Sequence, residues 1–77
     1  MKFNEQHQII LDAFYNRRYG VSPTATRSAV ESHARRHLLK GADYTRALDS
    51  AIAAGLLVSM SDASLAIRGA GRNMLPK

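Results

Sequence analysis

The chain has 77 residues, no cysteine and no tryptophan, and a formal net charge of +5 at pH 7. This length predicts one domain with a small core, and the lack of cysteine excludes disulfides and thiolate chemistry. No apolar run approaches the roughly 20 residues of a membrane-spanning helix, and the first residues lack the pattern of a secretory signal. We therefore expect a cytoplasmic protein that does not bind membranes.

The first predicted helix covers residues 4–19. Asn4 can cap its start by accepting a hydrogen bond from a free backbone amide, and Arg17 and Arg18 suit the negative end of the helix dipole. Gly20 can end the helix by adopting a left-handed conformation. The apolar residues of this segment recur on one face, which indicates a helix that packs against the core.

The second predicted helix begins at Ser22 and Pro23, where a capping hydroxyl precedes a proline at the first helical position. It should end near Leu39 or Lys40, before Gly41. A break within residues 24–28, which read T-A-T-R-S, would instead give a short turn followed by a helix. The sequence is compatible with both alternatives.

The polar face of residues 21–40 holds the densest positive charge of the chain, with one acid, Glu31, among four cations: Arg27, Arg35, Arg36 and Lys40. Such a face can neutralise phosphates, or it can be a solvated surface with ion pairs between residues four apart. His33 and His37 have the spacing of helical metal ligands, but the arginines between them disfavour a cation. We expect no metal and no cofactor.

The third predicted helix covers residues 44–54, with Asp43 as its cap after a turn at 41–43 and Gly55 as its end. The apolar spacing predicts four buried positions, Ala47, Leu48, Ala51 and Ile52. The positions expected to point outward are Tyr44, Thr45, Arg46, Asp49, Ser50 and Ala53.

A two-stranded hairpin should follow, with strands at 56–60 and 64–68 and a turn that reads S-D-A-S. Gly69 and Gly71 should loosen the chain, Leu75 should fold back onto the core, and Lys77 should be frayed. The large residues expected in the core are Phe3, Ile9, Ile10, Leu11, Phe14, Val30, Leu38, Leu39, Leu48, Ile52, Leu56, Leu57, Val58, Leu65, Ile67 and Leu75.

Residues 48–75 resemble winged helix-turn-helix transcriptional regulators. In that family a helix leads to a glycine and two apolar residues, as Leu48 to Leu57 do here, and an apolar residue after the wing precedes a glycine and a basic residue, as in Ile67 to Arg72. The resemblance implies one winged-helix-like domain over residues 1–77, mainly α, with three helices and a two-stranded wing.

The resemblance also implies a transcription regulator that binds duplex DNA. The acids and serines form no catalytic motif, so we expect no enzyme, and the small size suggests a bacterial or phage protein. By the resemblance, the third helix would enter the major groove, with Tyr44, Thr45, Arg46 and Ser50 facing the bases. The candidates for phosphate contact are Arg27, Arg35, Arg36, Lys40, Arg68 and Arg72. The positive charge lies mainly on the second helix, because residues 41–60 have a net charge of −1.

A second hypothesis follows from that near-neutral third helix. The same scaffold can serve as a protein-interaction module or a small inhibitor that blocks a larger partner with an acidic or nucleic-acid-binding surface. Self-association as a homodimer is also left open. Tyr15 and Tyr19, four residues apart, are either stacking surfaces for unpaired bases or half-buried core residues.

Overall fold

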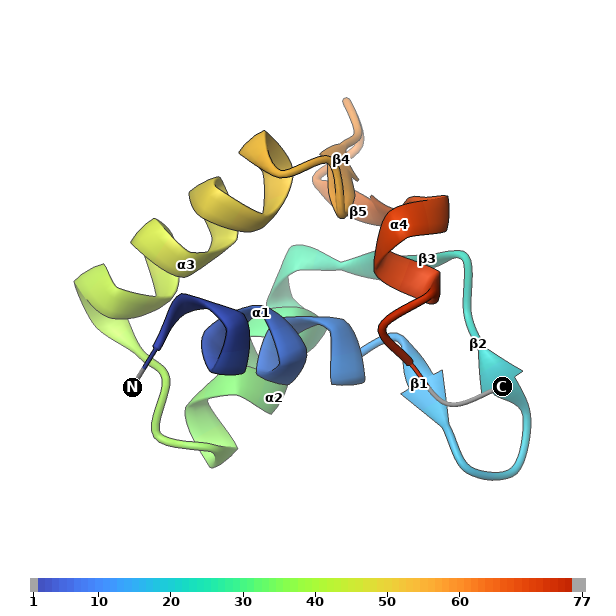
Figure 1. Cartoon of the computed structure of the whole chain (residues 1–77), viewed down its shortest axis with the longest axis horizontal. Coiled ribbons are helices and arrows are strands. Elements are labelled where there is room, and N and C mark those ends of the chain that lie inside the picture. The colour runs from blue at the N-terminus through green and yellow to red at the C-terminus, as the bar shows by residue number, and fades with distance from the viewer. Residues whose placement is uncertain (1, 76–77) are drawn as a thin grey trace.

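The computed structural model describes residues 2–75 and contains four helices and two small antiparallel sheets (Figure 1). The elements in chain order are α1 (Phe3–Asp12), β1 (Tyr15–Asn16), β2 (Gly20–Val21), β3 (Thr24–Thr26), α2 (Arg27–Arg36), α3 (Gly41–Ala53), β4 (Leu57–Ser59), β5 (Ser64–Ile67) and α4 (Gly69–Arg72). None of the helices in this part of the chain is both long and apolar enough to cross a membrane.

The larger sheet has the strand order β3-β5-β4, and both strand pairs are antiparallel. The predicted β4–β5 hairpin is confirmed, with Val58 opposite Ala66. The third strand was not predicted: β3 pairs with the other edge of β5 and places Ala25 opposite Leu65. This pairing connects the segment before α2 to the hairpin after α3.

The core lies where α1 packs against both α2 and α3 (Figure 1). Its buried residues come from these three helices, the segments that directly follow them, the larger sheet and the C-terminal segment: Ile10, Leu11, Phe14, Val30, Ala34, Leu39, Tyr44, Ala47, Leu48, Ala51, Leu56, Leu57, Leu65 and Leu75. The prediction that Leu75 returns to the core is confirmed. Two predicted core residues are exposed instead, Phe3 at 56% and Leu38 at 80%.

The first helix is shorter than predicted, because α1 ends at Asp12 and the chain continues into the β1–β2 hairpin. Asn16 explains much of this difference. Its side-chain oxygen accepts hydrogen bonds from the backbone amides of Arg18 at 2.7 Å and Tyr19 at 3.1 Å, and so stabilises a turn in place of a helix. The predicted cap was also wrong, since Asn4 lies within the helix and its side chain accepts from the amide of Glu5.

The second helix begins at Arg27, so the predicted start at Ser22 was wrong. Thr26 is the N-cap, and its hydroxyl accepts a hydrogen bond from the amide of Ala29 at 3.1 Å. The break considered within residues 24–28 exists, but the residues before it form a strand and not a turn. The pairing of β3 with β5 decides this, because isolated propensity for a three-residue segment is easily overridden.

Helices α2 and α3 end in the same way, with one difference. After α3, the amides of Gly55 and Leu56 bond to the carbonyls of Ile52 and Ala51, and Gly55 has a φ of 78°. This is the Schellman motif, in which a left-handed residue lets two amides satisfy free helix carbonyls. After α2, Leu38 and Leu39 make the equivalent bonds to Arg35 and Ala34, but the left-handed residue is Leu38, with a φ of 66°.

Replacing Leu38 by glycine should raise the free energy of unfolding by about 0.5–1 kcal/mol, because a side chain is disfavoured in the left-handed region and this one packs against little. Thermal and urea unfolding would measure the change. Leu38→Ala keeps the unfavourable backbone conformation and should be nearly neutral, whereas Gly55→Ala should destabilise. A Leu38→Gly variant that is less stable than wild type would show that the leucine makes stabilising contacts.

The third helix starts at Gly41, earlier than predicted, so residues 41–43 are helical and do not form a turn. Asp43 lies in the first turn and does not cap the helix. The chain after β5 also differs from the prediction, because Gly69–Arg72 form the short helix α4 and Gly71 is buried. The prediction for Lys77 falls outside the residues that the structure describes.

Candidate nucleic-acid interface

Helix α2 carries its predicted cations on the surface. Val30 and Ala34 face the core, whereas Arg27, Arg35 and Arg36 are exposed, as is Lys40 just before α3. Arginines in the last turn also interact favourably with the negative end of the helix dipole. The charge of α2 therefore stabilises the helix and remains available to an anionic partner.

Residues 2–75 contain two ion pairs, of which one involves a cation of α2 and the other a cation of α3. Arg35 lies 3.7 Å from Glu31, with both side chains well exposed, and Arg46 pairs with Asp43 at 2.5 Å. Exposed pairs of this kind contribute only about 0–1 kcal/mol, so an anion can compete for these arginines. Arg36 and Lys40 make no ion pair within the described residues, and they are the freest cations of this group.

Arg27 connects the start of α2 with the hairpin. Its guanidinium donates a hydrogen bond to the hydroxyl of Ser59 at the end of β4. The contact joins α2 to the β4–β5 hairpin. It also means that this arginine is oriented by the fold, whereas Arg36 and Lys40 are not.

Tyr44 does not point outward, which corrects the prediction for the first of the four base-facing residues. Its side chain is 6% exposed, and its hydroxyl has no hydrogen-bond partner among the described residues. Burial raises the pKa of this phenol, the charge of Glu31 raises it further, and Arg27 opposes the change. The spacing of α3 contained this signal, because Tyr44 lies three residues before Ala47 and four before Leu48 and so shares their buried face.

The other three predicted base-facing residues are already engaged. The hydroxyl of Thr45 donates to the carbonyl of Gly41 at 3.3 Å, and Arg46 is paired with Asp43. Ser50 faces α1, where its hydroxyl is hydrogen-bonded to Nε2 of His7 at 3.0 Å. Of the four residues predicted to face bases, only Thr45 and Arg46 are exposed, and they could contact a partner after a change of rotamer.

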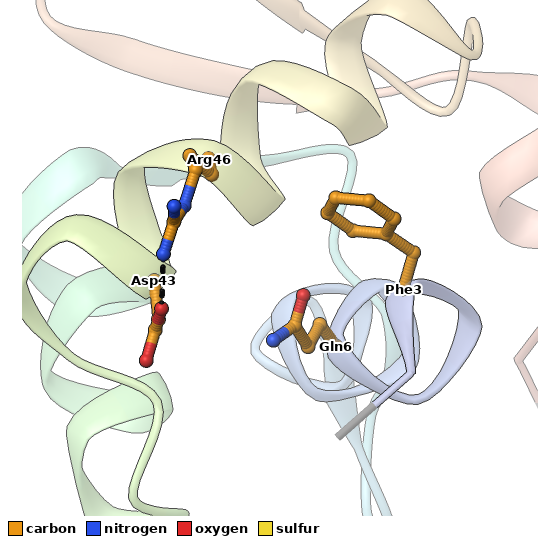
Figure 2. A pocket seen from close by; sticks show the side chains of 4 residues that line it. All are labelled: Phe3, Gln6, Asp43 and Arg46. Carbon is orange, nitrogen blue, oxygen red and sulfur yellow. Dashed lines mark hydrogen bonds and ion pairs between the residues drawn. The ribbon is translucent and has the colours of Figure 1, made fainter.

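A shallow pocket of about 280 Å³ lies between α1 and α3. Figure 2 shows Phe3 and Gln6 on α1, and Asp43 and Arg46 on α3, with the guanidinium of Arg46 directed toward Asp43. The Phe3 ring stacks on His7, with 6.1 Å between the ring centroids. Burial lowers the pKa of His7. The two charged groups that line this pocket, Asp43 and Arg46, are paired with each other.

Arg68 and Arg72 are exposed but belong to a different part of the molecule. Arg68 precedes α4 and Arg72 ends it, and α4 lies on the opposite side from the turn at 37–40 (Figure 1). The ten residues predicted to bind nucleic acid therefore do not form one continuous surface. Those on α2 and its turn form one group, which we call the α2 face: Arg27, Arg35, Arg36 and Lys40.

His33 is partly buried, and its Nε2 atom has no hydrogen-bond partner in residues 2–75. Burial lowers the pKa of His33, as do the nearby His37 and Arg36, while Asp12 acts in the opposite direction. These effects disfavour the charged form of the imidazole. The described residues contain no group of three side chains that could hold a metal ion.

The Tyr44→Phe variant should be as stable as wild type or about 1 kcal/mol more stable, because it removes a buried hydroxyl that has no partner. Urea unfolding would measure this, with Tyr19→Phe as the control for loss of an exposed hydroxyl. If the domain binds DNA, Tyr44→Phe should leave its affinity unchanged. A loss of more than about 1 kcal/mol would instead show that a water or a rotated Glu31 satisfies the hydroxyl.

Comparisons with known proteins identified no relative of this chain. No protein-family model matches the chain, and neither the search of curated proteins nor the search of solved structures returned a match.

Proposed function

We propose that this chain is a small winged-helix protein that binds duplex DNA, with the α2 face as its main contact to the phosphates. The order of its elements supports this proposal. Helices α2 and α3 are separated by residues 37–40, a connection of the length found in helix-turn-helix motifs, and the β4–β5 hairpin follows in the position of a wing.

The observation that carries the proposal is the exposure of Arg27, Arg35 and Arg36 on α2, whose Val30 and Ala34 are buried, and of Lys40 in the connection to α3. Each phosphate that such a cation neutralises releases bound counterions and increases affinity. Arg27 is oriented by Ser59, and Arg35 needs only to exchange Glu31 for a phosphate. The face can therefore bind a phosphate backbone without rearrangement of the fold.

Base recognition has weaker support than phosphate contact. Tyr44 and Ser50 are turned toward the protein, and Arg46 must leave Asp43 before it can donate to a base. In this proposal, affinity comes mainly from the backbone, and α3 contributes modest sequence preference through Thr45 and Arg46. Regulation of transcription would then depend on where the bound protein obstructs or recruits other factors.

Fluorescence anisotropy with a labelled blunt duplex, measured over a series of salt concentrations, tests the proposal. Replacing both Arg35 and Arg36 by alanine should weaken binding on the order of tenfold and reduce the salt slope by about 0.9 for each phosphate that is no longer neutralised. The effect should be similar for duplexes of different sequence, because phosphate contacts carry no base information.

The matched control replaces Arg17 and Arg18 by alanine, which removes the same charge from the β1–β2 turn. That turn and the turn at 37–40 lie at opposite ends of the molecule (Figure 1). If both double variants weaken duplex binding equally, net charge alone explains the affinity and the α2 face is not the site. Absence of duplex binding by the wild type at low salt would contradict the proposal as a whole.

A second candidate function is docking to a protein through α3, and the near-neutral surface of that helix favours it. Arg46 is balanced by Asp43, Asp49 is exposed nearby, and Phe3 is an exposed apolar residue beside the pocket of Figure 2. Affinity purification with and without nuclease separates the two functions. A stoichiometric protein that survives nuclease and is lost in Phe3→Ala supports docking, and recovery of nucleic acid alone supports the first proposal.

A further inference from the structure

The turn between β1 and β2 presents three consecutive exposed side chains, Arg17, Arg18 and Tyr19. The sequence pattern predicts a helix for these residues, in which they would point in different directions. In the structure they share one turn, which we call the hairpin tip. Tyr19 is 79% exposed, although tyrosine is often half-buried.

The hairpin tip is held in a defined shape. The side chain of Asn16 accepts hydrogen bonds from the amides of both Arg18 and Tyr19, and the strands pair through Asn16 opposite Gly20. The base of the hairpin is tied to the core, because the carbonyl of Phe14 accepts a hydrogen bond from the amide of Ser22 at 2.7 Å. Ordering of the tip therefore adds little entropic cost when a ligand binds.

The chemistry of the tip combines a flat aromatic surface with positive charge. The guanidinium carbon of Arg18 lies 5.8 Å from the centroid of the Tyr19 ring. This contact occupies one side of the ring, and the high exposure of Tyr19 leaves surface for a second flat group. Residues 13–22 contain no acid, and within residues 2–75 neither Arg17 nor Arg18 forms an ion pair.

A ligand that is complementary to the hairpin tip needs a flat π system and a negative charge a few ångströms from that π system. An unpaired nucleotide has both, since its base can stack on tyrosine and its phosphates can contact the arginines. The bases within a blunt duplex are already stacked on one another, so the ring cannot reach them. We propose that the hairpin tip binds an unpaired nucleotide of a single-stranded nucleic acid, with the base stacked on Tyr19 and the phosphates near Arg17 and Arg18.

This site is separate from the α2 face and does not depend on the proposed duplex binding. The hairpin tip and the turn at 37–40 lie at opposite ends of the view in Figure 1. A substrate that contains both a duplex and a single-stranded extension could occupy the two surfaces together. Such a substrate should then bind more tightly than a blunt duplex or a single strand alone.

Anisotropy with three labelled probes tests the inference: an oligothymidine single strand, a blunt duplex, and the same duplex with a thymidine overhang. Tyr19→Ala should weaken binding of the single strand by about 5- to 150-fold, the range for loss of one stacked base. Tyr19→Phe keeps the ring and should bind nearly as wild type. Both variants change only an exposed side chain, so their thermal unfolding should match that of wild type.

The double variants distinguish this site from the α2 face. Replacing Arg17 and Arg18 by alanine should weaken binding of the single strand more than binding of the duplex. Replacing Arg35 and Arg36 by alanine should weaken binding of the duplex more than binding of the single strand. Equal binding of the single strand by Tyr19→Ala and wild type would overturn the inference, as would failure of wild type to bind it at low salt. Either result leaves the duplex measurement, and so the proposed function, to be judged independently.

Discussion

Replacing Phe14 by alanine should lower the free energy of unfolding by about 3–5 kcal/mol, the usual loss when a fully buried aromatic side chain is truncated. Phe14 is 1% exposed and is one of the largest fully buried side chains in the described part of the chain. It follows α1 directly, and its carbonyl anchors Ser22 at the base of the β1–β2 hairpin. The cavity would therefore lie where the helix, the hairpin and the core meet.

Urea unfolding monitored by circular dichroism would measure this loss. Phe3→Ala is the control, because Phe3 is the only other phenylalanine and is mostly exposed, and it should change stability by about 0.5 kcal/mol or less. A loss of several kcal/mol is a large fraction of the stability of a small domain. If Phe14→Ala does not fold, Phe14→Leu should fold with a smaller loss, and equal stabilities of Phe14→Leu and wild type would contradict the structure here.

Replacing Gly71 by alanine should destabilise the protein by about 1–3 kcal/mol or more, because the added methyl group has no space. A Cβ atom at this position would lie 2.5 Å from the backbone carbonyl oxygen of Leu56 and 3.0 Å from a side-chain carbon of Ile67. The same carbonyl accepts a hydrogen bond from the amide of Arg68 at 2.9 Å. Relief of the clash would move α4 and weaken that bond.

Gly69→Ala is the matched control on the same helix. A Cβ atom at Gly69 would meet nothing within 4 Å, so alanine should be neutral or should stabilise by up to about 1 kcal/mol through lower entropy of the unfolded chain. Thermal unfolding of both variants measures the contrast. Similar melting temperatures for the two would show that α4 does not pack closely against the chain at Leu56.

The sequence predicted best those elements whose pattern is local. The buried stripe of Ala47, Leu48 and Ala51, the end of α3 at Gly55 and the β4–β5 hairpin are all present. Each depends on residues that are close in the chain: helical spacing of apolar side chains, a glycine free to adopt positive φ, and polar turn residues between two apolar runs.

The sequence predicted less well the places where a distant partner decides. Residues 24–26 look like the start of a helix, but pairing with β5 makes them a strand. Tyr44 is a different case, because it lies three residues before Ala47 and four before Leu48, so the local spacing already places it on the buried face of α3. The turn at Asn16 was also missed, because the regular apolar spacing of residues 9–14 predicts that the first helix continues.

The candidate site was likewise predicted only in part. The α2 face follows from the sequence, because its four cations lie within a short segment whose apolar residues recur at helical spacing. The sequence does not show which of these side chains are free to bind a ligand. Arg27 is bonded to Ser59 of β4, and Ser50 to His7 of α1. Arg46 is bonded to Asp43, one turn earlier on α3. The sequence offered Tyr19 as a possible stacking surface, but it did not predict the hairpin tip, because a helix would separate the directions of Arg17, Arg18 and Tyr19.

The sequence by itself therefore determined the local conformations that depend on neighbouring residues, together with the total charge and its concentration between Arg27 and Lys40. Only the tertiary structure decided which of these residues remain exposed and unengaged. The physical reason is that burial and hydrogen bonding at a surface are set by contacts between elements far apart in the chain. The pattern of residue types along the sequence does not specify those contacts directly.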